Sequence, residues 1–523
     1  MAYKILPAPL KGINSALQEI QLSPRSQEAP RVINMLPTNA GTLRKRYGYE
    51  IVASGDYPQA IYEFGAADGV AHLVYVDKTT RNLKRVVRGS NGTFSAENLG
   101  SIGGSADDSI SFTTFGGAGE ITLYVVSAGQ EVKKWAPGDA AVADFDHTGF
   151  DFIKPTAIAQ YKGHLLYANT SEYLGSGNTE NFPYRVRWSG FGDVTFWRVR
   201  SDSTAGFVDL IEEAGNAPIL AMRPLREVLA VYKTNSIYTL VARGSGEFDP
   251  ELKAGDKGIV SSNAVAPVID GNQHLMVAED NIYLFNGFSL TTPALGNKVR
   301  KYFFERLDAS KKTQIVVHSV PSRNECWILF DVLEDFALDE HNTREAICWN
   351  WEYNSWTHHS LHAHGFLHSN TYFSAPTSVV GISNKSGAST TYHKGLALMR
   401  TDDTQDEDRA IVGEIDYPLM SEVDRAGVRN KHTILEAEAD IAAIPNEDTE
   451  LTTSVAIRGF NSVLEEPTVS DFIENTSSDF PKHYYLINHL YRQFIGLKLK
   501  FQTADKTEEF AEVRIKTSET ERY

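Results

Sequence analysis

Histidines form the densest group of ionisable side chains in this sequence. They lie in the stretch WTHHSLHAHGFLH, at His358, His359, His362, His364 and His368. On a single strand the even-numbered positions would share one face, and a zinc site needs three or four ligands in tetrahedral geometry. A straight strand, however, spreads the first and last of these side chains over roughly 33 Å. No Cys, Asp or Glu lies within the stretch. We therefore predict a polar strand face here and no metal site.

A second group with possible chemistry is the turn FGDVTFW, residues 191–197. Its Asp193, Thr195 and Trp197 partly match the Asp-box turn found in propeller glycosidases, which reads Ser-x-Asp-x-Gly-x-Thr-Trp. That motif normally recurs in several blades, whereas this sequence holds one imperfect copy. We predict a packed turn without a catalytic role.

Neighbouring carboxylates occur at Asp107-Asp108, Glu212-Glu213 and Asp402-Asp403. Glycoside hydrolysis needs two carboxyl groups about 5 to 9 Å apart across a cleft, but these pairs are flanked by residues typical of exposed turns. The motifs of phosphate-binding loops, zinc proteases, serine hydrolases and calcium loops are missing. The sequence therefore predicts no catalytic site, no cofactor and no metal, and we expect that the chain is not an enzyme.

Positive charge is concentrated in NMLPTNAGTLRKRYGYE, where Arg44, Lys45 and Arg46 directly precede Tyr47. The chain as a whole has a net charge of −17, from 50 Lys and Arg against 67 Asp and Glu. Such a surface repels polyphosphate at long range, and three cations supply at most three phosphate contacts. We predict an exposed basic turn that forms salt bridges with an acidic neighbour. These four residues are also the candidate assembly contact.

The elements that position these residues follow a repeated hairpin pattern. Seven pairs of short apolar runs are separated by polar turns rich in Asn, Asp, Gly and Ser, which is typical of β-hairpins. Their first apolar residues are Leu73, Ile121, Leu165, Val228, Leu275, Cys326 and Val379, at spacings of 44 to 63 residues. A four-stranded unit every 40 to 50 residues or so is the period of β-propeller blades. A pair of β-sandwiches remains an alternative.

We predict an all-β protein with three parts. Residues 1–57 form an N-terminal arm, and residues 58–400 form a propeller of six or seven blades with an insertion at about 172–210. After the charged stretch RTDDTQDEDRA, interpreted as an exposed linker, residues 401–523 form a C-terminal antiparallel sandwich-like domain. There the apolar Leu497 and Leu499 alternate with Lys498 and Lys500, as in an antiparallel sheet with one face exposed to solvent. One helix is expected around residues 297–310.

The two cysteines, Cys326 and Cys348, each stand before a Trp and are expected to be buried strand residues with free thiols. Free thiols suit a reducing compartment. The N-terminal residues lack a signal-peptide pattern, and no run of about 18 apolar residues is present. We therefore expect a cytoplasmic product that does not span a membrane.

Several motifs, taken in order, resemble one family. The pieces are LRKRYGYE, RVRWSGFGDVTFW, VLAVYKTNSIYTLV, DKGIVSSNAVAPVIDGNQHLMVAEDNIYLFNGFSL and CWNWEYNSWTHHSL. Their order, over residues 30–370, is similar to that of the nozzle or hub proteins that extend the tail below the portal of short-tailed bacteriophages. This family includes the packaged-DNA stabilisation proteins.

The resemblance implies a structural virion protein in the tail, assembled in the host cytoplasm. It would form a homo-oligomeric ring, usually a hexamer, that contacts the head-to-tail adaptor ring and other tail proteins. Genomic DNA would pass through the ring without sequence-specific binding, be retained there and be ejected at infection. We hypothesise that carboxylates line the bore and repel the duplex, and that the basic segment docks on an acidic neighbour or on the adaptor.

Two other functions stay open. One is a host-receptor binding protein of the tail. The other is a propeller enzyme that degrades glycans, which would need clustered carboxylates with Arg and Tyr in its central channel.

Overall fold

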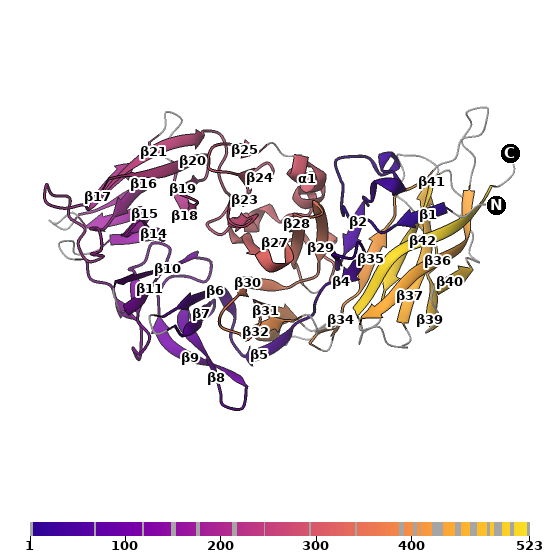
Figure 1. Cartoon of the computed structure of the whole chain (residues 1–523), viewed down its shortest axis with the longest axis horizontal. Helices are drawn as coiled ribbons and strands as arrows, with labels where there is room; N and C mark the ends of the chain where they lie inside the picture. The colour runs from indigo at the N-terminus through magenta and orange to yellow at the C-terminus, as the bar shows by residue number, and fades with distance from the viewer. Residues whose placement is uncertain are drawn as a thin grey trace.

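The chain folds almost entirely into β-strands, arranged as a ring of small sheets beside a pair of larger ones (Figure 1). This computed structural model describes residues 4–66, 69–117, 120–147, 153–173, 178–211, 217–244, 246–291, 294–339, 342–385, 392–400, 405–407, 409–420, 432–444, 451–460, 468–477, 482–485, 494–502 and 507–519. The predicted fold class, an all-β propeller with an added β domain, is confirmed.

The ring is a propeller whose described residues form seven four-stranded blades. The first blade holds β6 (Pro58–Gly65), β7 (Ala71–Asp77), β8 (Asn82–Arg88) and β9 (Phe94–Ser101). The second holds β10 (Ile110–Gly117), β11 (Glu120–Ser127), β12 (Lys133–Trp135) and β13 (Ala143–Asp144). The third holds β14 (Ile153–Tyr161), β15 (His164–Tyr173), β16 (Thr179–Trp188) and β17 (Gly206–Asp209).

Three further blades follow in chain order. The fourth holds β18 (Ile219–Leu225), β19 (Val228–Lys233), β20 (Ile237–Arg243) and β21 (Glu247–Ala254). The fifth holds β22 (Val265–Val268), β23 (Gln273–Val277), β24 (Ile282–Phe285) and β25 (Leu290–Thr291). The sixth holds β26 (Val316–Val320), β27 (Glu325–Asp331), β28 (Arg344–Asn350) and β29 (Ser355–His359). Each of the seven predicted hairpins begins with the second strand of a blade.

The seventh blade joins two distant parts of the chain. It holds β30 (Ala363–Ser369), β31 (Thr377–Lys385), β32 (Tyr392–Met399) and, as outer strand, β5 (Glu50–Ser54). In the antiparallel register of β5 and β32, Ala53 faces Leu396. Because β5 comes from the predicted arm, the arm closes the propeller ring.

Hydrophobic clusters hold neighbouring blades together around the whole ring. Trp135 packs with residues of the first and second blades, and Tyr167 packs with residues of the second and third. Ile61 and Val379 belong to the cluster between the first and seventh blades, so the circle of cores is complete. The inner strands of the blades are thereby largely buried.

The remaining strands form a two-sheet sandwich. One sheet holds β1 (Lys4–Pro7), β3 (Met35–Pro37), β4 (Leu43–Lys45), β42 (Thr507–Glu519), β36 (His432–Ile444) and β40 (Lys482–Tyr485). The other holds β2 (Arg31–Ile33), β35 (Gly413–Asp416), β41 (Phe494–Phe501), β37 (Leu451–Phe460), β38 (Thr468–Val469) and β39 (Ile473–Ser477). In β41, Leu497 and Leu499 are buried while Lys498 and Lys500 pair with Glu414, as the alternation predicts.

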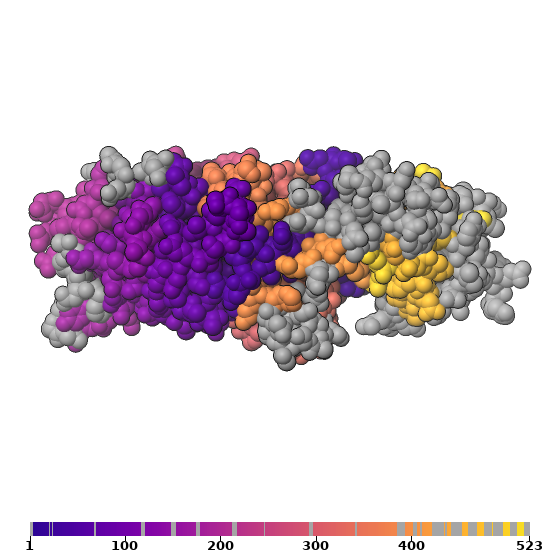
Figure 2. Space-filling model, turned by 90° about the horizontal axis from the view of Figure 1, so that it is seen from below, coloured from indigo at the N-terminus to yellow at the C-terminus, as the bar shows by residue number. Residues whose placement is uncertain are grey.

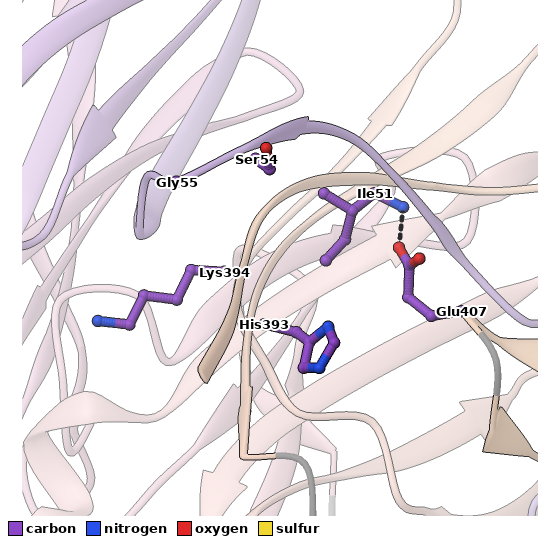
Figure 3. Close-up of a pocket in the computed structure, with 6 residues that line it drawn as sticks. All are labelled: Ile51, Ser54, Gly55, His393, Lys394 and Glu407. Carbon is purple, nitrogen blue, oxygen red and sulfur yellow. Dashed lines mark hydrogen bonds between the residues drawn. The ribbon is translucent and has the colours of Figure 1, made fainter. Parts of the chain in front are cut away.

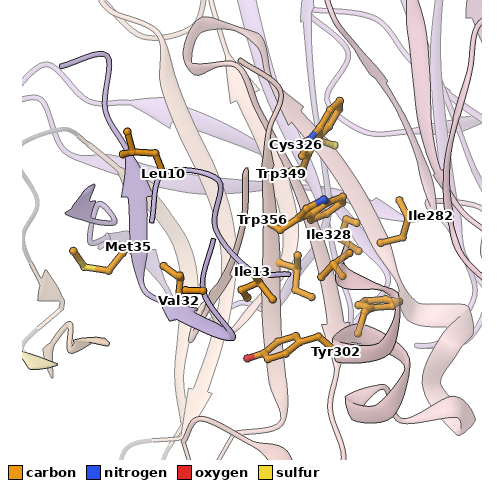
Figure 4. Packing of buried hydrophobic residues seen from close by; sticks show 14 of the residues in the cluster. Leu10, Ile13, Val32, Met35, Ile282, Tyr302, Cys326, Ile328, Trp349 and Trp356 are labelled. Atoms are coloured by element: carbon orange, nitrogen blue, oxygen red, sulfur yellow. The ribbon is translucent and has the colours of Figure 1, made fainter. Parts of the chain in front are cut away.

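Propeller and sandwich share one sheet and one core. Strand β2 pairs with β29 of the sixth blade on one side and with β35 of the sandwich on the other. Residues of the arm, among them Ile13 and Val32, lie between the two parts and pack near Trp356 and Tyr302 (Figure 4). Gly12 has a φ of 64°, and a Cβ there would lie 2.1 Å from the Trp356 carbonyl oxygen. The two parts lie side by side along the long axis (Figure 2).

Two smaller expectations are also met. The helix α1 (Ala294–Arg306) begins three residues before the predicted one, and a 3-10 turn (Ala309–Gln314) follows it. Cys326 and Cys348 are buried free thiols. Burial raises the pKa of both, so neither forms a thiolate readily.

Candidate functional site

The basic segment is mostly buried, in contrast to the predicted exposed turn. Lys45 and Arg46 are each 1% exposed and Tyr47 is 5% exposed, whereas Arg44 is partly exposed. The sequence prediction was wrong here because it treated all three cations as surface groups. An acidic neighbour is present, but within the same chain.

That neighbour is Asp406. The Arg46 guanidinium donates from Nη1 to one carboxylate oxygen at 2.8 Å and from Nη2 to the other. It also donates to the carbonyl oxygens of Tyr47 at 2.9 Å and Ser360 at 3.0 Å. Asp406 belongs to the stretch expected to be an exposed linker, and that expectation is wrong at this residue, which is 8% exposed. A bidentate pair of this kind fixes the orientation of the two side chains as well as the distance between them.

Residues 405–407 act as a latch on the strand that closes the propeller. The Tyr49 backbone N–H donates to the Gln405 carbonyl at 3.0 Å, and the Glu407 N–H donates to the Tyr49 carbonyl at 2.9 Å. The Glu407 carboxylate accepts from the Ile51 backbone N–H at the start of β5 (Figure 3). A Cβ at Gly48 would lie 1.9 Å from the Gln405 carbonyl oxygen, so the latch needs glycine there.

Beside the latch lies an open depression of about 560 Å³ between β5 and β32. His393 and Lys394 of β32 and Glu407 of the latch line it (Figure 3).

Tyr47 lies between two guanidinium groups. Arg44 stands 4.1 Å and Arg323 4.8 Å from the centre of its ring. Such cation–π contacts stabilise by about 0.5–1 kcal/mol at exposed sites. The four predicted contact residues therefore serve the chain's own packing; that they also form an assembly contact stays a prediction.

The histidines do not lie on one strand, because β29 ends at His359 and β30 begins at Ala363. The His358 Nδ1 is 2.8 Å from the Tyr302 hydroxyl, and its Nε2 is 2.6 Å from Glu345. His364 of β30 is 2.6 Å from the hydroxyl of Tyr57, which lies in the connection between β5 and β6. Burial lowers the pKa of His368 to about 4. Among the described residues no three His, Cys, Asp or Glu are grouped to hold a metal ion.

The turn at Asp193 is a packed turn. The Asp193 carboxylate accepts from the Thr195 backbone N–H at 3.0 Å and from its hydroxyl at 2.7 Å. Trp197 is fully buried and stacks on Tyr167 with ring centres 4.1 Å apart.

A buried ion network beside this turn was not predicted. Glu172 is fully buried between Arg185 at 3.3 Å and Arg187 at 2.8 Å. Asp209 of β17 accepts from Arg185 at 2.7 Å. The Arg-x-Arg spacing places both guanidinium groups on one strand face, and this is the signal that sequence reasoning could have used.

The carboxylate pairs do not form a catalytic pair where the structure describes them. Asp107 is exposed and lies 3.7 Å from Lys78, while Asp108 accepts from Ser105 within its own loop. Glu212-Glu213 and Asp402-Asp403 lie outside the described residues.

The centre of the propeller holds a cavity of about 520 Å³ lined by the innermost strand of every blade. None of its lining residues is Asp or Glu, and Arg223 of β18 is the single Lys or Arg among them. The aromatic residues Tyr62 and Phe112 stack there with ring centres 5.2 Å apart. The clustered carboxylates that a propeller glycosidase needs do not line this cavity.

Comparisons with known proteins found matches among solved structures. No protein-family description and no curated protein matches the chain. A crystal structure of a protein from Lactobacillus plantarum is 11% identical, covers 71% of this chain and 94% of its own, and has a TM-score of 0.35. A structure described as YCF48 bound to D1 peptide is 10% identical, covers 68% of this chain and 94% of its own, and has a TM-score of 0.34.

The Aleuria aurantia lectin AAL, as a point mutant in complex with Fucalpha1-6GlcNAc, is 12% identical with a TM-score of 0.30. The match covers 57% of this chain and 94% of the lectin. Similarity this low carries no argument about function. Within the part of the chain that the structure describes, no helix is long and apolar enough to cross a membrane.

Proposed function

We propose that this chain is a structural subunit of a virion tail, forming the nozzle ring below the portal and adaptor of a short-tailed bacteriophage. One observation supports it most: the sixth blade and the sandwich form a continuous ten-stranded sheet over a common core. A ring closes only when each subunit holds two different interfaces at a fixed angle. A propeller fused to a sandwich in this way is a stiff block of that kind.

The path for DNA in this proposal lies between subunits. The propeller cavity, at about 520 Å³, has the size of a small-molecule site and cannot admit a duplex. A bore along the ring axis would instead be walled by the outer surfaces of several copies. With a net charge of −17 per chain, these surfaces release few counterions on contact with DNA, so the duplex slides without sticking.

The mass of the purified full chain in solution tests the proposal, together with negative-stain images alone and with tail proteins. We expect a closed ring of about six copies, or ring formation once the adaptor is added. A chain that stays monomeric under both conditions, and is absent from purified tails, would refute the tail assignment. Binding to a purified host surface glycan instead would favour the adsorption protein.

Arg44 gives a sharper assembly test than a triple alanine variant. Lys45 and Arg46 are buried, so removing all three cations would damage the fold and hide any effect on assembly. We expect Arg44→Glu to weaken ring or tail assembly while the fold stays intact by circular dichroism. Arg25→Glu, at an exposed position of the arm, is the control for a charge reversal elsewhere on the arm.

A further inference from the structure

The central cavity holds a cation without a carboxylate. Arg223 donates from Nη1 to the Met222 carbonyl at 2.9 Å and from Nη2 to the Ser262 carbonyl at 3.2 Å. No salt bridge to Asp or Glu is formed by it within the described residues. These two bonds hold the guanidinium plane in place but leave its charge without a counter-charge.

Arg223 is partly exposed, and the buried arginines in the described residues differ from it. Arg46, Arg185, Arg187, Arg344 and Arg458 each have a carboxylate within hydrogen-bonding or ion-pair distance. Arg81 lacks a direct ion pair, yet Asp107 and Asp108 act on it electrostatically. Buried charges in proteins are normally paired, because an isolated one is costly to remove from water.

The electrostatic surroundings of Arg223 agree with its lack of a carboxylate partner among the described residues. Burial lowers its pKa, and the groups that oppose the fall are the phenols of Tyr232 and Tyr62, with no carboxylate among them. His274, next to it, is held neutral because burial and then the Arg223 charge lower its pKa to about 4. Burial also lowers the pKa of the lining residue His318 to about 3. At neutral pH the described residues that line the cavity therefore carry one positive charge and no negative one.

The other lining residues could contact the apolar part of a small organic ligand. The stacked rings of Tyr62 and Phe112, together with Leu367, supply apolar surface. The amide of Gln160 and the hydroxyl of Thr114 supply hydrogen-bonding groups. A volume of about 520 Å³ falls within the range of roughly 300–1,000 Å³ typical of ligand pockets.

We propose that the propeller cavity is a binding site for a small organic anion, a carboxylate or phosphate monoester with a planar or apolar body, whose charged group pairs with Arg223. The guanidinium is suited to this, because its planar group can form bidentate hydrogen bonds with either a carboxylate or a phosphate. The site lies inside one chain and does not depend on ring formation, so its test is separate from that of the proposed function.

Isothermal titration calorimetry of the full chain at constant ionic strength tests the proposal with benzoate, phenyl phosphate and benzylamine. We expect at least one of the anions to bind at least tenfold more tightly than the cation. A preference for benzoate identifies the natural ligand as a carboxylate, and a preference for phenyl phosphate identifies it as a phosphate. Anions that bind no better than benzylamine overturn the proposal.

Two variants locate the site. Arg223→Gln should weaken anion binding at least tenfold, whereas Arg226→Gln, three residues later and exposed, should change it less than twofold. Equal binding by both variants overturns the proposal. If Arg223→Gln does not fold, the wild-type chain still gives an answer by NMR: a saturating anion should raise the pKa of His274, and an unchanged value overturns the site.

Discussion

Two guanidinium groups, the buried Arg46 at the latch and the partly exposed Arg223 in the propeller cavity, have different surroundings. Arg46 has a carboxylate supplied by Asp406, 360 residues away in sequence, whereas Arg223 has backbone carbonyls and phenols. Each lowers the pKa of a buried histidine, Arg46 that of His359 and Arg223 that of His274, in both cases after burial as the larger cause.

The difference teaches that a cation's role is set by what the fold brings to it. The three consecutive cations at residues 44–46 attract attention in the sequence, yet one of them, Arg46, binds Asp406 of the same chain. Arg223 stands in the ordinary strand ILAMRPL and lacks any neighbour in sequence that marks it. It nevertheless carries the one charge among the described residues that line the central cavity.

The largest effect is expected from breaking the paired site. Arg46→Met leaves the Asp406 carboxylate buried without a partner, and the loss of one member of such a pair costs about 3–5 kcal/mol. The free energy of unfolding, from urea denaturation followed by tryptophan fluorescence, should fall by that amount.

The double variant Arg46→Met with Asp406→Leu is the control. Since both charges are removed together, we expect most of the lost stability to return. A double variant no more stable than Arg46→Met alone would show that the pair is not coupled.

The pH dependence of stability tests the buried histidine beside Arg223. The pKa of His274 falls from about 6.5 in the unfolded chain to about 4 in the folded one. Between these pH values the unfolded chain binds more protons than the folded one. The contribution of neutral His274 to the free energy of unfolding is therefore fully present above pH 6.5. It decreases as the pH falls towards 4, by up to roughly 3 kcal/mol. Denaturation series at pH 7, 6, 5 and 4 measure this slope, which His274→Gln should reduce.

A smaller effect is expected from removing the unpaired cation. Arg223→Gln leaves no carboxylate behind and loses only bonds to two carbonyl groups, so we expect a stability change within about 1 kcal/mol. The pKa of His274 should rise in this variant, as read from the pH titration of its ring protons by NMR. A loss of stability as large as that of Arg46→Met would show that Arg223, like Arg46, is part of a buried charge pair.

The smallest effect is expected at the rim of the paired site. Arg44→Ala removes one of the two guanidinium groups that face Tyr47, and we expect a loss of about 0.5 kcal/mol in urea denaturation. A loss above about 2 kcal/mol would show that Arg44 belongs to the buried network.

Local patterns carried most of the secondary structure. The hairpin starts at Leu73 and Val379 mark the second strands of the first and seventh blades, because alternation and turn residues act over a few positions. The break after His359 was missed, since no Gly or Pro marks the place where the chain leaves one blade for the next. The Arg46 site was predicted in part. The basic residues and an acidic partner were expected, but the burial of Arg46 and the identity of that partner, Asp406, were not.

The amino-acid sequence by itself determined the strands, the blade period, the free thiols and the acidic balance, because these follow from neighbouring residues and from composition. Only the tertiary structure decided that β5 closes the ring, that β2 links the sixth blade to the sandwich, and that Arg46 binds Asp406 whereas Arg223 binds backbone carbonyls. The physical reason is that burial and charge pairing depend on contacts between segments hundreds of residues apart, which no local pattern encodes.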